Sequence, residues 1–374
     1  MARGIIGHLD PTRFYFPSSP WGYHDIGNDQ STGDTHCNSY QTAMKGEGLS
    51  FFRKHLSAFD AALASEIAVQ GCSTLNSLKK YIPEDKLWPV NEVWDHHFTR
   101  NPYDGTDTTF IQQQMQAAEE LFGSFDSVGN FVKKSMAVHA EFVKADVEYH
   151  RSRKGSCSGA MMWMYSDVWP CGTWALIDYY LEPKAAFYSA KRVFEPVRPI
   201  ISQHKDGIHA FLVNDTLEPT ECTIEVGQAA VDGNILRNDI IPKRIYSENS
   251  SVKILSFKDI DPDADYLYIH VNDGTRLLRN TFFHKLWKDI VWSDPELSVV
   301  FSDPEQMNVL ELTIEAKKYA RMVRIIVPDQ EQVFFSDNYF DIEPGEVKEI
   351  RLESDKCLKP EQISIQTWTE DWNS

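Results

Sequence analysis

The pattern of apolar and polar positions divides the chain into two parts, with the change near residue 197. In the first part, a short apolar run at 61–68 is typical of a buried strand, and helical patterns alternate with such runs. Four stretches have the apolar spacing of helices: 49–60, 107–123, 127–151 and 183–194. A further helix is predicted after Ser73, a plausible N-cap, and it stops near Pro83. A short aromatic strand is predicted at 13–16, where prolines end it.

Beyond residue 197 the chain consists of short alternating runs separated by turn signals such as Asp-Gly. Examples are 208–213, 222–226 and 266–271, and a second set starts near Trp292. Regular short strands of this kind predict antiparallel sandwiches. The sequence thus predicts a multidomain protein, α/β and then all-β, with domains at 1–197, 198–287 and 288–374.

The segment 157–180 passes from an apolar run into a cluster of aromatic and acidic residues. One interpretation is a core strand followed by an aromatic loop, because aromatic side chains are usually buried. The other is a sugar-binding floor at the top of a barrel strand, where tryptophan faces stack on a pyranose and carboxylates bind hydroxyls. The pattern alone leaves both open.

Glu66 lies near the end of a small apolar strand, where an ordinary surface acid is out of place. Taken alone, such a glutamate is either a structural ion-pair partner or a catalytic carboxylate.

Composition excludes several classes of function. The net charge of −18 argues against nucleic acid or an anionic membrane as partner. No apolar run approaches the roughly 20 residues of a membrane span. The start of the sequence lacks the apolar core of a signal peptide, which favours a cytoplasmic location. The six scattered cysteines and the histidines form no metal-binding pattern, so no metal and no cofactor are expected.

Several motifs carry a resemblance to a known family. They are LDPTRFYFPSSP at 9–20, GDTH at 33–36, ASEIAVQG at 64–71, LKKYIPED at 78–85, GAMMWMYSDVWP at 159–170 and FFSDNYFDIEPGE at 334–346. In this order they resemble the family 2 glycoside hydrolases, most closely the β-mannosidases. The resemblance implies the C-terminal part of such an enzyme: strands five to eight of a (β/α)8 barrel, followed by two immunoglobulin-like β-sandwich domains.

The resemblance also implies a role for individual residues. Glu66 matches the nucleophile of a retaining exo-β-glycosidase, and Trp163 matches the tryptophan beneath the sugar. His36 lies in a loop that lines the sugar subsite, and its alternative role is a hydrogen bond to backbone. Asp167 and Trp169 either bind the sugar or brace the floor on which it lies.

The family's acid/base glutamate has no match in this chain, since Asn91-Glu92 stands in the wrong place and context. Asn38 replaces an expected tryptophan, which puts mannoside specificity in doubt and leaves other sugars, such as β-glucosaminides or β-galactosides, open. The implied substrate is a β-linked oligosaccharide or glycoside. Two unpaired edges of a half-barrel imply pairing with the missing N-terminal half or with a second copy of the chain. The alternative is a truncated or accessory protein that binds glycan without cleaving it.

Overall fold

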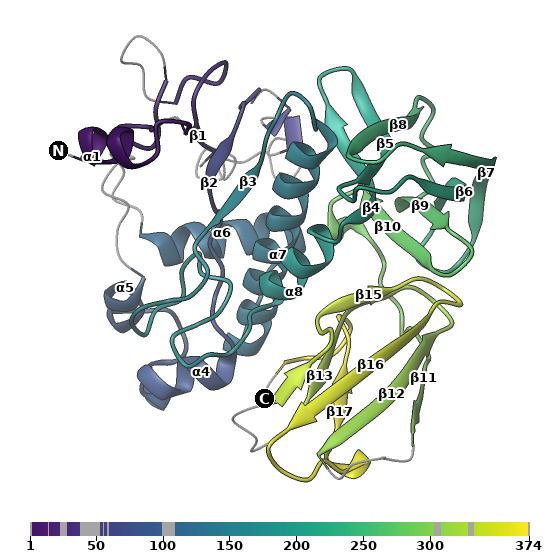
Figure 1. Ribbon diagram of the computed structural model, residues 1–374. Coiled ribbons are helices and arrows are strands. Elements are labelled where there is room, and N and C mark those ends of the chain that lie inside the picture. The colour runs from purple at the N-terminus through teal and green to yellow at the C-terminus, as the bar shows by residue number, and fades with distance from the viewer. Residues whose placement is uncertain are drawn as a thin grey trace.

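The computed structural model describes residues 2–13, 15–22, 28–37, 53–54, 56–57, 60–98, 109–302, 308–327 and 333–372. Figure 1 shows a helical part that carries a small sheet, followed by two parts built from strands. The chain is therefore mixed α/β and all-β, as the apolar pattern predicts. The predicted boundaries near 197 and 288 stay predictions, although β4 begins at Val197 and the 3₁₀ turn η3 (Trp287–Asp289) separates the two β parts.

Helices surround a three-stranded parallel sheet of order β1-β2-β3 in the first part. Its strands are β1 (Thr35–His36), β2 (Ala64–Ala68) and β3 (Ala160–Trp163). Its helices are α1 (Ala2–Leu9), α4 (Leu75–Tyr81), α5 (Glu92–His97), α6 (Phe110–Phe122), α7 (Val128–Ser152) and α8 (Ala185–Val193), with a 3₁₀ turn η2 (Glu84–Lys86).

The long helices form where apolar periodicity and capping residues agree. The Thr109 side chain accepts from the Gln112 backbone while Gln112 returns a bond to the Thr109 backbone, which completes a capping box at the start of α6. The Ser127 side chain caps α7 by accepting from the Asn130 amide. The cap of α4 is Thr74 rather than the predicted Ser73.

The predicted strand at 13–16 is wrong where the structure describes it, because neither Arg13 nor 15–16 is in a strand. Phe14 lies outside the described residues. Phe16 instead packs its ring edge-on against Trp21, with centroids 5.3 Å apart. A local aromatic contact thus replaces pairing with a sheet. Of the predicted helix at 49–60, Arg53, Lys54 and Leu56 are helical, and much of the rest lies outside the described residues.

The second part packs a four-stranded sheet against a three-stranded one, in the orders β10-β9-β6-β7 and β4-β5-β8. Apolar side chains from both sheets share one core. The strands are β4 (Val197–His204), β5 (Gly207–Asn214), β6 (Thr220–Ala229), β7 (Ile235–Tyr246), β8 (Ser250–Phe257), β9 (Tyr266–Asn272) and β10 (Leu277–Phe283).

The third part repeats this two-sheet arrangement, with the orders β11-β12-β16-β14 and β15-β13-β17 around a separate core. Within the described residues, the strands of this part pair antiparallel. The strands are β11 (Leu297–Phe301), β12 (Val309–Ala316), β13 (Ala320–Ile326), β14 (Val333–Phe335), β15 (Phe340–Ile342), β16 (Val347–Ser354) and β17 (Ser364–Gln366), with a 3₁₀ turn η4 (Pro360–Gln362).

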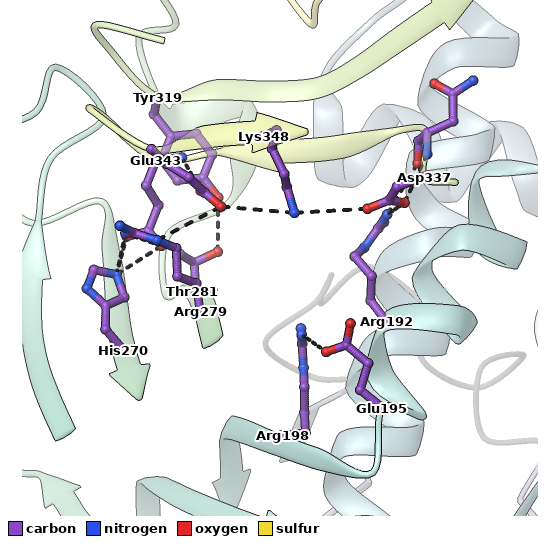
Figure 2. A network of polar contacts seen from close by, with 12 residues as sticks. Arg192, Glu195, Arg198, His270, Arg279, Thr281, Tyr319, Asp337, Glu343 and Lys348 are labelled. Atoms are coloured by element: carbon purple, nitrogen blue, oxygen red, sulfur yellow. Dashed lines mark hydrogen bonds and ion pairs between the residues drawn. The ribbon is translucent and has the colours of Figure 1, made fainter. Parts of the chain in front are cut away.

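A continuous junction joins the three parts. Arg192 on α8 donates to the Asn338 and Tyr339 carbonyls, and Glu343 accepts from His270 of β9 at 2.8 Å, as Figure 2 shows for part of this network. Lys133 on α7 donates to the carbonyls of Trp368 and Glu370 at 3.0 and 2.7 Å. The helices are therefore fixed to both β parts by polar contacts as well as by a shared apolar core.

Candidate active site

Three parallel strands bring the predicted residues together along the small sheet (Figure 1). His36 of β1 is the register partner of Glu66 on β2. Ala68, two positions beyond Glu66, is the register partner of Trp163 on β3. Because side chains two positions apart on a strand share a face, three residues predicted from separate motifs lie in one neighbourhood.

The His36 ring lies against the Glu66 carboxylate, with Nδ1 3.5 Å from Oε2. The exposed fractions of the two side chains are 22% and 19%. A carboxylate in this position contacts protein on one side and is open to a ligand on another. An ionised carboxylate held beside an imidazole has the chemistry of an attacking nucleophile.

Asp34, immediately before β1, is the buried hub of a hydrogen-bond network behind His36. Its Oδ2 accepts from Ser19 Oγ at 2.5 Å and from Ser65 Oγ at 2.6 Å, and its Oδ1 accepts from the Trp21 amide at 2.7 Å. Burial raises the pKa of the Asp34 carboxyl, but the hydrogen bonds from Ser19, Ser65 and Trp21 outweigh burial and hold the pKa below its ordinary value. Asp34 is therefore an anion at neutral pH.

Trp163 ends β3 with 47% of its surface exposed, and its neighbours Met161 and Tyr165 are exposed by 52% and 65%. The burial of β3 alternates, so one face of the strand is covered while the other is open. A half-exposed indole beside a carboxylate is suited to stacking on a sugar ring.

The Asp167 side chain is fully buried, and protein groups contact both oxygens of its carboxylate. Lys184 Nζ lies 3.3 Å from Oδ2, with both side chains 0% exposed. Thr173 Oγ1 and Cys171 Sγ both contact Oδ1, at 3.3 and 3.2 Å. Of the two interpretations of Asp167, this environment favours bracing of the floor over contact with a sugar.

Trp169 packs on α5 and keeps 37% of its surface exposed. Its ring stacks on His97, with centroids 5.5 Å and planes 22° apart, and His96 meets it edge-on. His97 Nδ1 in turn lies 2.7 Å from the Pro170 carbonyl oxygen. These contacts fix the loop after β3, and they leave part of the Trp169 ring accessible, so both of its predicted roles stay open.

Glu92 lies apart from this arrangement in its contacts. It is the first residue of α5, and its side chain is 79% exposed and pairs with Lys86 at 3.7 Å. That setting gives no reason to transfer the acid/base role to it. Asn38, the position of the expected tryptophan, lies outside the described residues.

Sequence reasoning missed the network formed by Ser19, Ser65 and Asp34. The signal was present, since Ser19 stands in the PSSP motif and Ser65 directly precedes Glu66. Their convergence depends on tertiary contacts between segments 15 to 46 residues apart. Within the described ranges, no group of three metal-binding side chains is found, and no helix there is long and apolar enough to cross a membrane.

Comparison with known proteins identifies relatives of this chain. Residues 291–371 match the family model described as an Ig-fold domain, Ig_mannosidase. A curated protein named β-mannosidase B from Aspergillus niger is 24% identical over 95% of this chain and 44% of its own length. The β-mannosidase B of Emericella nidulans is also 24% identical, over 96% of this chain and 45% of its own length. The chain thus spans less than half the length of the curated relatives it matches.

Solved structures show the same fold. A β-D-mannosidase from Dictyoglomus thermophilum superposes with a TM-score of 0.83 at 24% identity, covering 98% of this chain and 44% of that one. The exo-chitosanase CsxA from Amycolatopsis orientalis gives a TM-score of 0.64 at 16% identity, covering 83% of this chain and 42% of that one. These matches agree with the resemblance that the motifs carry: the chain is similar to proteins named β-mannosidase along nearly its whole length, and residues 291–371 match their Ig-fold domain.

Proposed function

We propose that this chain supplies part of the active site of a retaining exo-β-glycosidase, most specifically a β-mannosidase acting on terminal β-D-mannosyl residues. The observation that carries the proposal is the 3.5 Å contact between His36 and Glu66, next to the half-exposed Trp163. The relatives named β-mannosidase support the sugar, whereas the exo-chitosanase match supports only the broader class of family 2 β-glycosidases.

In this proposal Glu66 attacks the anomeric carbon of a sugar stacked on Trp163. The carbon–oxygen bond to Glu66 forms while the bond to the leaving oxygen breaks, and a second carboxyl group gives that oxygen its proton. Water then releases the sugar, and the second group accepts the proton of the water. Retaining geometry needs the second carboxyl group about 5–5.5 Å from Glu66. We place that group on a polypeptide segment that the motifs of this chain do not include.

A partner that continues the parallel sheet follows from the same proposal. Each outer strand of the sheet, β1 and β3, pairs on one side only in the ranges that the structure describes. Unpaired edges and the exposed Met161 and Tyr165 favour addition of further strands. We propose that the missing N-terminal half, or a second copy of the chain, covers them. Sedimentation as a monomer with one cooperative melt would count against both partners.

Labelling with 2-deoxy-2-fluoro-β-mannosyl fluoride tests the nucleophile directly, since fluoride leaves without strong acid assistance. We expect one added fluoromannosyl group on the peptide that contains Glu66, detected by mass spectrometry. Glu66→Gln is expected to abolish it, and Trp163→Ala to slow it by about tenfold or more.

Glu92→Gln is the matched control, because it removes an exposed glutamate with no contact to the sheet. It is expected to label at the original rate. Labelling of another carboxylate would overturn the role of Glu66. Absence of labelling, together with retained binding of mannosides, would favour the accessory glycan-binding protein instead.

A further inference from the structure

We propose that Asp34 and Ser19 are positioning residues that hold His36 as an imidazolium, with one N–H on Ser19 and the other facing Glu66. The inference rests on the proposed role of Glu66 and adds to it a relay of four side chains: Asp34, Ser19, His36 and Glu66. The positions of the hydrogens in these contacts support this inference.

Asp34 uses the only hydrogen of the Ser19 hydroxyl. An ionised carboxylate accepts hydrogen bonds and donates none. Ser19 Oγ therefore donates to Asp34 Oδ2 across 2.5 Å, the length of a strong charge-assisted bond. Ser65 donates to the same oxygen at 2.6 Å, so its hydrogen is also committed.

Ser19 can then only accept from His36. Its Oγ lies 3.1 Å from His36 Nε2. With the Ser19 hydrogen given to Asp34, a hydrogen on Nε2 is what makes this contact favourable. The buried anion thus selects the ring nitrogen that carries a proton, although Asp34 itself does not touch the ring.

The second ring nitrogen faces Glu66. In a neutral ring protonated at Nε2, Nδ1 presents a lone pair, which repels an ionised carboxylate. The 3.5 Å separation from Glu66 Oε2 is therefore favourable when Nδ1 also carries a hydrogen. His36 is then a cation between two anions, Glu66 directly and Asp34 through Ser19.

Among the described residues, the other groups in contact with His36 carry no charge. The backbone amide of His36 donates to the Asn28 side chain, which holds the residue without changing its charge. The neighbouring Cys37 thiol stays neutral, since burial raises its pKa to about 12. Protonation of His36 is thus set from Ser19 and Glu66.

The consequence for the proposed reaction is orientation of the nucleophile. A cation beside Oε2 of Glu66 fixes the orientation of the carboxylate and leaves its other oxygen for the substrate. When the bond to the sugar forms, fluoride or an alcohol leaves with the electron pair, and the Glu66 negative charge is consumed. Because Ser19 and Asp34 hold His36 through Nε2, the ring stays in place during that change.

Nitrogen-15 NMR of the full chain, labelled in histidine, tests the protonation state without any need for turnover. At pH 7.5, where an ordinary imidazole with a pKa of about 6.5 is mostly neutral, we expect both His36 nitrogens to have imidazolium shifts, and in Asp34→Asn we expect a neutral ring in a larger fraction of molecules. A neutral His36 in the original chain at pH 7.5 would overturn the relay.

The rate of fluoromannosyl labelling against pH is the second readout. Asp34→Asn and Ser19→Ala are expected to lower the rate about tenfold and to move its alkaline limit to lower pH, and Ser19→Thr is expected to restore both. Glu92→Gln, which changes an exposed carboxylate paired with Lys86, is the control and leaves the alkaline limit in place. Identical profiles in all variants would refute the positioning role.

The two proposals fail in different ways. Failure of the original chain to label at Glu66 contradicts the nucleophile, whatever His36 does. Correct labelling at Glu66 with unchanged pH profiles in Asp34→Asn contradicts only the relay. Should the variants fail to fold, the NMR measurement on the original chain still decides whether His36 is a cation.

Discussion

The parallel sheet and the junction between the three parts treat ionisable groups in opposite ways. On the sheet, His36 of β1 and Glu66 of the central strand β2 each keep about a fifth of their side-chain surface exposed, 22% and 19%. At the junction, Arg321 of β13 is 0% exposed, 2.9 Å from Glu141 of α7 and 3.6 Å from Asp341 of β15. The groups that we propose to meet a ligand are accessible, whereas those that join the three parts are enclosed and paired.

Aromatic rings enclose the Arg321 guanidinium on its remaining sides. The nearest is Trp287, with its ring centroid 4.8 Å away. Four more rings lie within 6 Å, those of Phe122, Phe283, Trp292 and Trp368. Cation–π contacts explain why Nε and Nη1 of this buried arginine lack hydrogen bonds.

The largest expected effect tests the junction. Arg321→Ala leaves Glu141 and Asp341 without their cation and empties the aromatic enclosure, so the free energy of unfolding should fall by about 3–5 kcal/mol. Urea denaturation followed by tryptophan fluorescence measures it. Arg351→Ala is the control, because that exposed arginine pairs with Glu311 and Glu353 and should cost about 1 kcal/mol or less. Equal losses in the two variants would remove the distinction between the regions.

A second variant tests whether Asp167 is structural, like the enclosed residues of the junction, or binds a ligand, as proposed for residues of the sheet. Asp167→Ala leaves Lys184 buried and unpaired, which should lower the free energy of unfolding by about 3 kcal/mol. The exposed Asp239, 3.4 Å from Arg237, is the control position, and its alanine variant should lose about 1 kcal/mol or less. Unchanged stability in Asp167→Ala combined with weaker mannoside binding would instead make Asp167 a sugar ligand.

The smallest expected effect concerns pH and a buried histidine of α7. Burial, and then Arg153, lower the pKa of His150 from its ordinary value to about 4. Between pH 6.5 and 4 the unfolded chain therefore binds a proton that the folded chain does not, so stability is lost as pH falls. The slope from this residue is at most about 1.4 kcal/mol per pH unit.

His150→Gln should flatten that slope, as measured by urea denaturation at pH 7, 6, 5 and 4.5. His150 is buried, with Nδ1 3.8 Å from Cys157 Sγ, so the substitution itself changes stability at every pH. The stability of the variant at pH 7 is therefore the reference for the slope of the variant. The same slope in both proteins would mean that other groups cause the loss at acid pH.

Sequence predicted the parts of this molecule that local chemistry determines. The helices α6 and α7 follow from apolar spacing, which is readable within a few residues, and the structure places their caps at Thr109 and Ser127. The position of Glu66 on a strand follows from a small apolar run. The cap of α4 lies one residue after the predicted Ser73, because serine and threonine are both preferred N-cap residues.

The rest depends on which distant segments meet. The enclosure of Arg321 is built from five rings in separate segments between residues 122 and 368, and no spacing in the sequence reveals it. The two roles left open for Asp167 could not be separated until Lys184 was seen beside it. The aromatic run at 13–16 has strand propensity, but Phe16 finds its partner in Trp21 rather than in a sheet.

The bonds from Lys133 to the Trp368 and Glu370 carbonyls have a consequence for the order of events during synthesis. These partners lie 235 and 237 residues further along the chain. At about 5–20 residues per second, a ribosome needs roughly 10–50 s to make the intervening sequence. Throughout that interval α7 exists without its final contacts, so the sheet that carries Glu66 is expected to complete its packing only after the last strands have emerged.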